Sequence, residues 1–167
     1  MIRRRCFQFM GMLMLLSLGL CFYGVKEAGA IEFYAARTYD VGTNPYSVAA
    51  ADLDGDGDAD LAVANYSSNT VSILKNTGDG TFAAAVNYAV GSNPLSVFAS
   101  DLDGDGDADL AVANSFWTSN IVSILRNNGN GTFAAAVNYA AGASPMSVFA
   151  SDLDGDGDAD LAVADYN

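Results

Sequence analysis

Three nine-residue stretches of the chain carry the sequence Asp-Leu-Asp-Gly-Asp-Gly-Asp-Ala-Asp, at residues 52–60, 101–109 and 152–160. Asp occupies the first, third, fifth, seventh and ninth places of each stretch, and Gly occupies the sixth. Ca²⁺ is a hard cation that takes six to eight oxygen ligands. Side chains at places one, three and five converge when the chain curls sharply, and Gly at the sixth place tolerates that curl. The spacing therefore predicts up to three Ca²⁺ sites.

All five Asp residues of each loop are predicted to contribute to its site, the seventh through its backbone carbonyl. The predicted metal ligands are Asp52, Asp54, Asp56, Asp58, Asp60, Asp101, Asp103, Asp105, Asp107, Asp109, Asp152, Asp154, Asp156, Asp158 and Asp160. Two carboxylates about 5 Å apart repel by roughly 3 kcal/mol at an effective dielectric constant near 20. Five carboxylates in such a loop favour a bound cation over the alternative, a solvated acidic turn without an ion.

The flanks of these loops distinguish them from helical calcium motifs. An EF-hand requires Glu at the twelfth place, where Val63 stands in the first copy. Dockerin modules also need a ligand at the twelfth place, and their paired loops lie closer together in sequence. The residues around each loop are rich in Val and Ala rather than patterned as helices. We therefore expect each loop to connect two β-strands.

The loops belong to a longer internal repeat. Thirteen residues from each first Asp are identical in the three copies, which begin 49 and 51 residues apart. Strands are expected in the first copy at residues 47–51, 61–64, 70–75 and 83–90, with a Gly-containing turn at 76–80. Four short antiparallel strands in about fifty residues correspond to one propeller blade. The prediction is an all-β fold, a partial β-propeller of four-stranded antiparallel blades with calcium loops.

These segments resemble a known family. Residues 47–52 and 60–65 resemble the FG-GAP repeat of integrin α-chain propellers, and the Asn-Gly-Asn-Gly-Thr-Phe run at 128–133 is similar to the bacterial FG-GAP-like repeats, often labelled VCBS. The resemblance covers nearly all of the chain after Ala30. It implies a β-propeller with calcium loops, extracellular adhesion or recognition, and often a place inside a larger surface protein.

The first thirty residues have the layout of a secretory signal peptide. Three consecutive Arg residues at 3–5 precede an apolar stretch from about residue 6 to 25, and Ala28-Gly29-Ala30 suits a signal peptidase. An uncleaved membrane anchor is the alternative, because the apolar stretch is about long enough to span a bilayer. We expect a signal peptide at 1–30, repeats at 31–167 and no membrane span after cleavage. The expected location is secreted or at the cell surface, extracellular or periplasmic, in a bacterium.

Composition excludes several kinds of chemistry. The chain has no His, and both Cys residues, Cys6 and Cys21, lie in the expected signal peptide. The remaining chain would have no thiolate nucleophile, imidazole base, disulfide or ordinary zinc site. It would carry three basic and 19 acidic residues, a formal charge of −16. Such a chain should repel nucleic acids and attract cations.

Three functions are compatible with these features. A binding or adhesion scaffold with structural calcium is favoured, its partner being an unidentified extracellular protein or glycan; Phe116 and Trp117 are the candidate contacts because their loop differs in length between repeats. A polysaccharide-active propeller enzyme, or a non-catalytic part of a larger surface enzyme, is the alternative. Acidic residues outside the loops after Ala30 are few, namely Glu32, Asp40, Asp79 and Asp165. We therefore expect that the chain is not an enzyme. A calcium sensor would need a bistable element, and the sequence indicates none.

The array of repeats is expected to be an incomplete propeller. Closed propellers typically need four to eight blades, whereas the chain supplies two full repeats and part of a third. Residues 33–40 align with the fourth-strand segment 82–89, and the third repeat stops after its second strand. The expectation is a fragment of a longer protein or a chain that self-associates through open blade edges.

Overall fold

The computed structural model describes residues 36–116 and 119–166, which form ten β-strands and no helix. No helix that could cross a membrane is therefore found in these two ranges. The expected signal peptide at 1–30 lies outside the described residues. The strands are β1 (Pro45–Ala51), β2 (Asp60–Asn65), β3 (Thr70–Leu74), β4 (Val86–Ala89), β5 (Pro94–Ser100), β6 (Asp109–Phe116), β7 (Ser119–Leu125), β8 (Val137–Ala140), β9 (Pro145–Ser151) and β10 (Asp160–Asp165).

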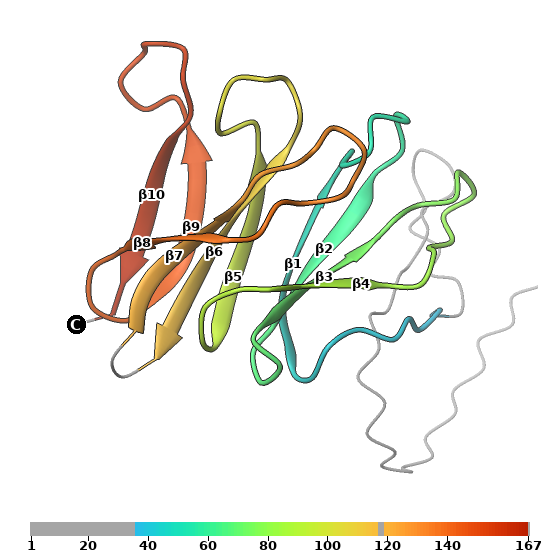
Figure 1. Ribbon diagram of the computed structural model, residues 1–167, viewed down its shortest axis with the longest axis horizontal. Helices are drawn as coiled ribbons and strands as arrows, with labels where there is room; N and C mark the ends of the chain where they lie inside the picture. Colours follow the sequence, from blue (N-terminus) through green and yellow to red (C-terminus); the bar gives the residue numbers. More distant parts are fainter. Residues whose placement is uncertain (1–35, 117–118, 167) are drawn as a thin grey trace, which may run out of the picture.

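The strands form three antiparallel sheets, one for each repeat, which stand side by side (Figure 1). Blade 1 has the order β1-β2-β3-β4 and blade 2 the order β5-β6-β7-β8. Blade 3 consists of β9 and β10 alone among the described residues. The predicted all-β fold of four-stranded antiparallel blades, a partial propeller-like array, is confirmed.

The inner strands form because their side chains are buried on both faces. All six residues of β2 are buried, and its sequence Asp-Leu-Ala-Val-Ala-Asn combines small and β-branched residues that suit a strand packed on both sides. Leu61 lies opposite Leu74 in the ladder between β2 and β3, and Leu110 lies opposite Leu125 in the ladder between β6 and β7. The equal registers show that the repeated sequence produces the same blade twice.

The largest core lies between blades 1 and 2. Val71 and Ile73 from blade 1 pack with Val97, Leu110 and other residues from blade 2, all of them nearly inaccessible to solvent. Burying an aliphatic side chain stabilises a fold by about 1.5–3 kcal/mol. A smaller cluster joins blades 2 and 3 and includes Val122 and Val148. The blades are therefore held to one another mainly by apolar packing between sheets.

The fourth strand of each blade is shorter than expected. The sequence predicts a strand at 83–90, whereas β4 covers Val86–Ala89. Phe82 instead forms an isolated bridge with Asn76, and the amide of Ala83 donates to the carbonyl of Lys75 at 2.8 Å. This closure of the turn takes the backbone of residues 82–83 out of the blade's regular ladder. The other predicted strands differ from the observed ones by two residues or fewer at each end.

Residues 36–40, the described part of the segment that aligns with the fourth-strand segment 82–89, do not form a strand. Asp40 makes one isolated bridge, and the rest of this described segment is irregular. Its side chains cover blade 1: Tyr39 and Val41 pack on the cluster that contains Leu61 and Val63. The ring of Tyr39 meets that of Phe82 edge to face at 5.4 Å. The segment therefore contributes a cover for one face of blade 1 rather than a strand.

Candidate metal centres

The three acidic loops lie at the same end of the molecule, each between the first and second strands of its blade (Figure 1). In the first loop the carboxylate of Asp52 accepts hydrogen bonds from the amides of Gly55 at 2.8 Å and Gly57 at 2.9 Å. Gly57 has a φ of 91°, a conformation that side chains disfavour, so the expected role of the sixth-place Gly is confirmed. The second and third loops repeat these bonds through Asp101 and Asp152.

Each loop brings together the Asp residues at its first, third and ninth places. One carboxylate oxygen of each of these three residues lies within 4.8 Å of the others. The clusters are Asp52, Asp54 and Asp60; Asp101, Asp103 and Asp109; and Asp152, Asp154 and Asp160. Three converging carboxylates form an all-oxygen donor set of the kind that hard divalent cations prefer. Each cluster could therefore hold a metal ion.

The Asp residues at the fifth and seventh places lie outside these clusters. The carboxylate of Asp56 accepts a hydrogen bond from the amide of Asp58 at 2.9 Å, which turns it back onto its own loop. The Asp58 carboxylate lies beside Gly78 in the following turn, where an added Cβ would be 3.3 Å from its Oδ2. The seventh-place side chain therefore lies against the neighbouring turn, which leaves its backbone carbonyl as the predicted ligand.

The ninth-place Asp anchors the loop to the blade. Asp60 is fully buried, and its two carboxylate oxygens accept hydrogen bonds from the amides of Leu53 at 3.0 Å and Asn76 at 2.7 Å. Burial raises the pKa of Asp60, the charges of Asp54 and Asp56 raise it further, and the two amide hydrogen bonds oppose them. Asp109 has the same environment and a pKa raised chiefly by burial. A neighbouring cation would therefore stabilise the ionised form of both carboxyl groups.

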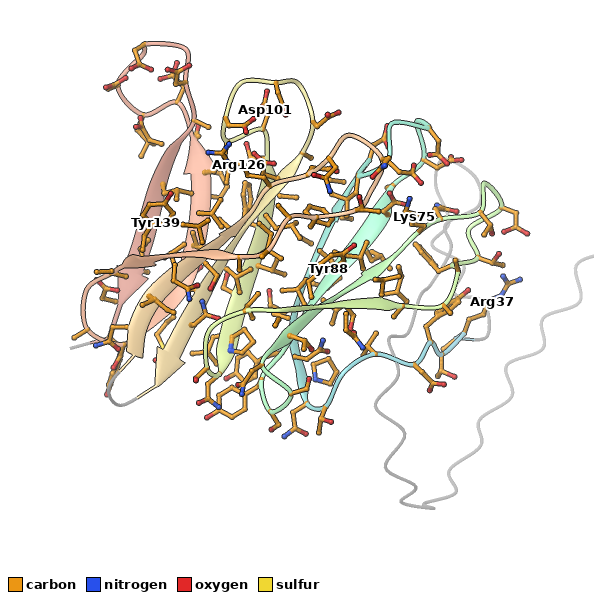
Figure 2. All side chains as sticks on the ribbon, viewed as in Figure 1. Arg37, Lys75, Tyr88, Asp101, Arg126 and Tyr139 are labelled. Atoms are coloured by element: carbon orange, nitrogen blue, oxygen red, sulfur yellow. The ribbon has the colours of Figure 1, made fainter. Side chains whose placement is uncertain are left out.

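A basic side chain accompanies the third-place Asp in the first two loops. Lys75 Nζ lies 3.3 Å from Asp54 Oδ2, and Arg126 Nη1 lies 3.6 Å from Asp103 Oδ2. Figure 2 shows both basic residues beside the acidic loops. The other oxygen of Asp54, Oδ1, is buried and has no hydrogen-bond partner. A buried carboxylate oxygen without a partner is unfavourable unless an ion or a water molecule occupies the space before it.

The sequence reasoning did not identify this pairing, although a signal was present. Lys75 and Arg126 each follow the third strand of a repeat at the same position, and they are two of only three basic residues after residue 30. In so acidic a chain, basic residues retained at equivalent positions indicate a local electrostatic role.

The third loop has the same sequence but a more open environment. Leu153 is 61% exposed, whereas its counterpart Leu53 is 2% exposed. Asp160 is partly exposed and accepts the amide of Leu153 at 3.0 Å. Among the described residues, blade 3 contributes no counterpart of the Asn76 amide that bonds to Asp60. The cluster thus forms without the strand and turn that cover the first two.

The remaining candidate residues lie apart from the clusters. Trp117 and the side chain of Phe116 lie outside the described residues, as does Glu32. Asp79 is in the exposed turn between β3 and β4, where hydrogen bonds from Thr81 and then Thr77 lower its pKa. Asp165 ends β10, and Asp40 precedes β1. The structure brings none of these described residues into the three clusters.

The family model of the FG-GAP-like repeat matches the chain three times, over residues 22–63, 52–112 and 101–163. Successive matches overlap at residues 52–63 and 101–112, which contain the first and second acidic loops. No curated protein matches the chain.

Proposed function

The chain belongs to the FG-GAP-like repeat family. We propose that it is an exported, calcium-binding repeat module that acts as a binding scaffold, and that calcium has a structural role in it. The observation that carries the proposal is the threefold recurrence of three carboxylates within 4.8 Å of one another. In the first cluster, one of those Asp residues has a buried oxygen without a partner. That combination fits a cation better than it fits an empty acidic turn.

Calcium is favoured over magnesium by the kind of site. Ca²⁺ accepts six to eight oxygens in flexible geometry, whereas Mg²⁺ demands near-ideal octahedral coordination and retains its water. The Asp residues at the first, third and ninth places would hold the ion, with the seventh-place carbonyl and water completing its shell. The bound ion would neutralise carboxylates that otherwise repel one another.

A structural role follows from what the loops contact. Leu53 of the first loop is buried between blades 1 and 2. Its carbonyl accepts a hydrogen bond from Asn127 Nδ2 of blade 2 at 2.8 Å. An ion that fixes this loop therefore also supports the contact between repeats. The resulting rigid edge would present neighbouring loops to an extracellular protein or glycan.

Isothermal titration calorimetry tests the metal proposal. The chain should bind up to three Ca²⁺ ions, and Asp54→Ala should remove one site while leaving the others. Asp79→Asn is the matched control, because it removes an acidic residue outside the clusters and should leave the number of sites unchanged. No calcium uptake at millimolar concentration would overturn the proposal.

Export has its own test. Because residues 1–30 have the layout of a signal peptide, the secreted protein should begin near Ile31. N-terminal sequencing of protein recovered outside the cytoplasm measures this directly. An intact Met1 on membrane-associated protein would instead support the anchor.

A further inference from the structure

The turn between β7 and β8 contains both Asn-Gly pairs of the chain, Asn128-Gly129 and Asn130-Gly131. Asn followed by Gly is the dipeptide most prone to lose its side-chain amide, because Gly has no side chain to hinder attack by its backbone nitrogen on the carbonyl carbon of the Asn side chain. Asn128 and Asn130 are both exposed to solvent. Any difference in reactivity between the two pairs therefore arises from the hydrogen bonds and charges around them.

The second pair has an activated side chain. Asn130 Oδ1 accepts hydrogen bonds from the amide of Thr132 at 3.0 Å and from its hydroxyl at 2.6 Å. Both donors are directed at the oxygen on which negative charge develops when a nucleophile adds to Cγ. The bond to the Thr132 amide closes a ring that contains both Asn130 Cγ and the Gly131 nitrogen. The Gly131 amide has no hydrogen-bond acceptor among the described residues, so its ionisation breaks no such bond.

The first pair is protected by its surroundings. The amide of Gly129, which would be the attacking group, donates to Asn127 Oδ1 at 3.1 Å. The carboxylate of Asp107 lies beside Gly129, where an added Cβ would be 2.6 Å from its Oδ2. A negative charge at this place opposes ionisation of the amide. Asn128 itself uses Nδ2 to donate to Thr132 Oγ1 at 3.0 Å, which gives its own carbonyl oxygen no donor.

We propose that Asn130 is a site of spontaneous deamidation, which places a carboxylate beside the first acidic loop. The Gly131 nitrogen gives its proton to water or hydroxide and bonds to Asn130 Cγ. The bond between Cγ and Nδ2 breaks, and Nδ2 takes up a proton and leaves as ammonia, so that a cyclic imide remains. Water then opens the imide to aspartate or isoaspartate. The net reaction consumes water and releases ammonia without any change of oxidation state.

The first repeat shows that the aspartate product fits the turn. Asp79 stands there at the position that Asn130 occupies in the second repeat. Its Oδ1 accepts the same two bonds, from the amide of Thr81 at 2.9 Å and from its hydroxyl at 2.6 Å. The bonds from Thr81 lower the pKa of Asp79, so the carboxylate is ionised at neutral pH. Aspartate at position 130 therefore keeps the turn and adds a negative charge to it.

The added charge lies next to the first acidic loop, because the β7–β8 turn reaches from blade 2 to blade 1 (Figure 1). Lys75 Nζ donates to the carbonyl of Asn130 and pairs with Asp54 Oδ2 at 3.3 Å. An added Cβ at Gly131 would be 2.9 Å from the Cβ of Asp54. A carboxylate at position 130 therefore competes with Asp54 for Lys75. Deamidation raises the calcium affinity of the first cluster, a consequence that rests on the proposed function.

Peptide mapping tests the modification without reference to calcium. The full chain is incubated in mildly alkaline buffer and digested with trypsin; the tryptic fragment 127–167 contains both pairs, because no Lys or Arg follows Arg126. Fragmentation mass spectrometry then locates the change from amide to acid. Asn130 should convert about fivefold faster than Asn128, the equivalent of one hydrogen bond. In guanidinium chloride the two rates should approach each other. Equal rates in the folded chain, or faster conversion of Asn128, would overturn the proposal.

Variants of Thr132 test the activation of the side chain. Thr132→Val removes the hydroxyl that donates to Asn130 Oδ1 and should slow conversion of Asn130 by about three- to tenfold. Thr132→Ser is the matched control, since it retains the hydroxyl and should leave the rate unchanged. The same peptide mapping measures both variants. A rate in Thr132→Val that equals or exceeds that of the unaltered chain would overturn the activating role of this turn.

Calorimetry with Ca²⁺ tests the consequence. Asn130→Asp, in a background of Asp103→Ala, should raise calcium affinity at the first site by about two- to fivefold. The gain should shrink when Lys75→Gln is added, because the two carboxylates then no longer compete for a cation. If the unaltered chain takes up no calcium, the proposed function fails while the mapping still decides the modification. If that chain binds calcium and Asn130→Asp leaves the affinity unchanged, the effect assigned to deamidation is overturned.

Discussion

The first and third acidic loops have the same thirteen residues but different surroundings. In the first, Asp60 is fully buried and Leu53 is 2% exposed; in the third, Asp160 is partly exposed and Leu153 is 61% exposed. The difference arises from the strands and turns that cover the first loop and are absent from blade 3 among the described residues. Burial of a loop is thus provided by residues distant in sequence, whereas convergence of its carboxylates is local.

The packing contrast between the two regions gives the largest expected effect. Leu110→Ala should lower the free energy of unfolding by about 2–5 kcal/mol, because it opens a cavity in the core between blades 1 and 2. Leu161→Ala, the same change one repeat later, should lower it by less than about 1.5 kcal/mol, because Leu161 is already partly exposed. Urea unfolding in calcium-free buffer measures both. Equal losses of unfolding free energy in the two variants would show that the face of β10 that carries Leu161 is covered in solution.

The hydrogen bonds of the ninth-place Asp give the next effect. Asp60→Ala leaves two amides, those of Leu53 and Asn76, without their acceptor and should destabilise the metal-free protein by about 1–3 kcal/mol. Asp160→Ala removes the acceptor of one exposed amide and should change stability by less than about 1 kcal/mol. The same urea series compares them, and a larger loss for Asp160→Ala would contradict the burial argument.

The pH dependence of stability should change sign with calcium. Burial raises the folded-state pKa of Asp60 and Asp109. Both groups therefore contribute stability that is fully present below their unfolded pKa of about 3.9, and this contribution is lost as pH rises through the raised folded-state values. In EDTA, these groups should raise the melting temperature as pH falls from about 7 towards 4. In calcium the trend should reverse, because protons displace the ion.

The double variant Asp60→Asn/Asp109→Asn should flatten the rise observed in EDTA. Asp79 has the opposite sign, since hydrogen bonds lower its pKa and its contribution is lost as pH falls. Asp79→Asn is therefore a control that should make the rise in EDTA steeper. A melting temperature that falls on acidification even in Asp79→Asn would argue against a dominant role for the two buried groups.

The smallest expected effect concerns the basic partner of the first loop. Lys75→Gln removes a cation beside Asp54 and should raise calcium affinity at the first site by about two- to fivefold, the equivalent of a partly exposed ion pair. The third site should not change, because no basic residue in the described part of the chain pairs with Asp154. Calorimetry resolves the sites in a background of Asp103→Ala, which removes the second one.

Much of this arrangement is predictable from sequence because it is local. Alternating Asp residues and the Gly at the sixth place determine the curl of the loop, and runs such as Leu-Ala-Val-Ala determine the inner strands. The position of the Asp58 carboxylate against Gly78 depends on the next turn, and the ion pair of Lys75 depends on strand register. Neither can be deduced from the loop itself. For the same reason the sequence did not reveal that residues 36–44 cover blade 1 instead of forming a strand.

The hydrogen bonds of Asn127 have a kinetic consequence. Its side chain joins Leu53 of the first loop to Ala108 of the second loop at 2.8 and 2.9 Å. The first loop therefore cannot lift from the sheet without breaking a contact between two repeats, and its opening rate is tied to the separation of blades rather than to the fluctuation of a single loop. The third loop makes no such bond among the described residues. An ion at the first cluster should accordingly dissociate slowly, and one at the third should exchange at the rate of a free surface loop.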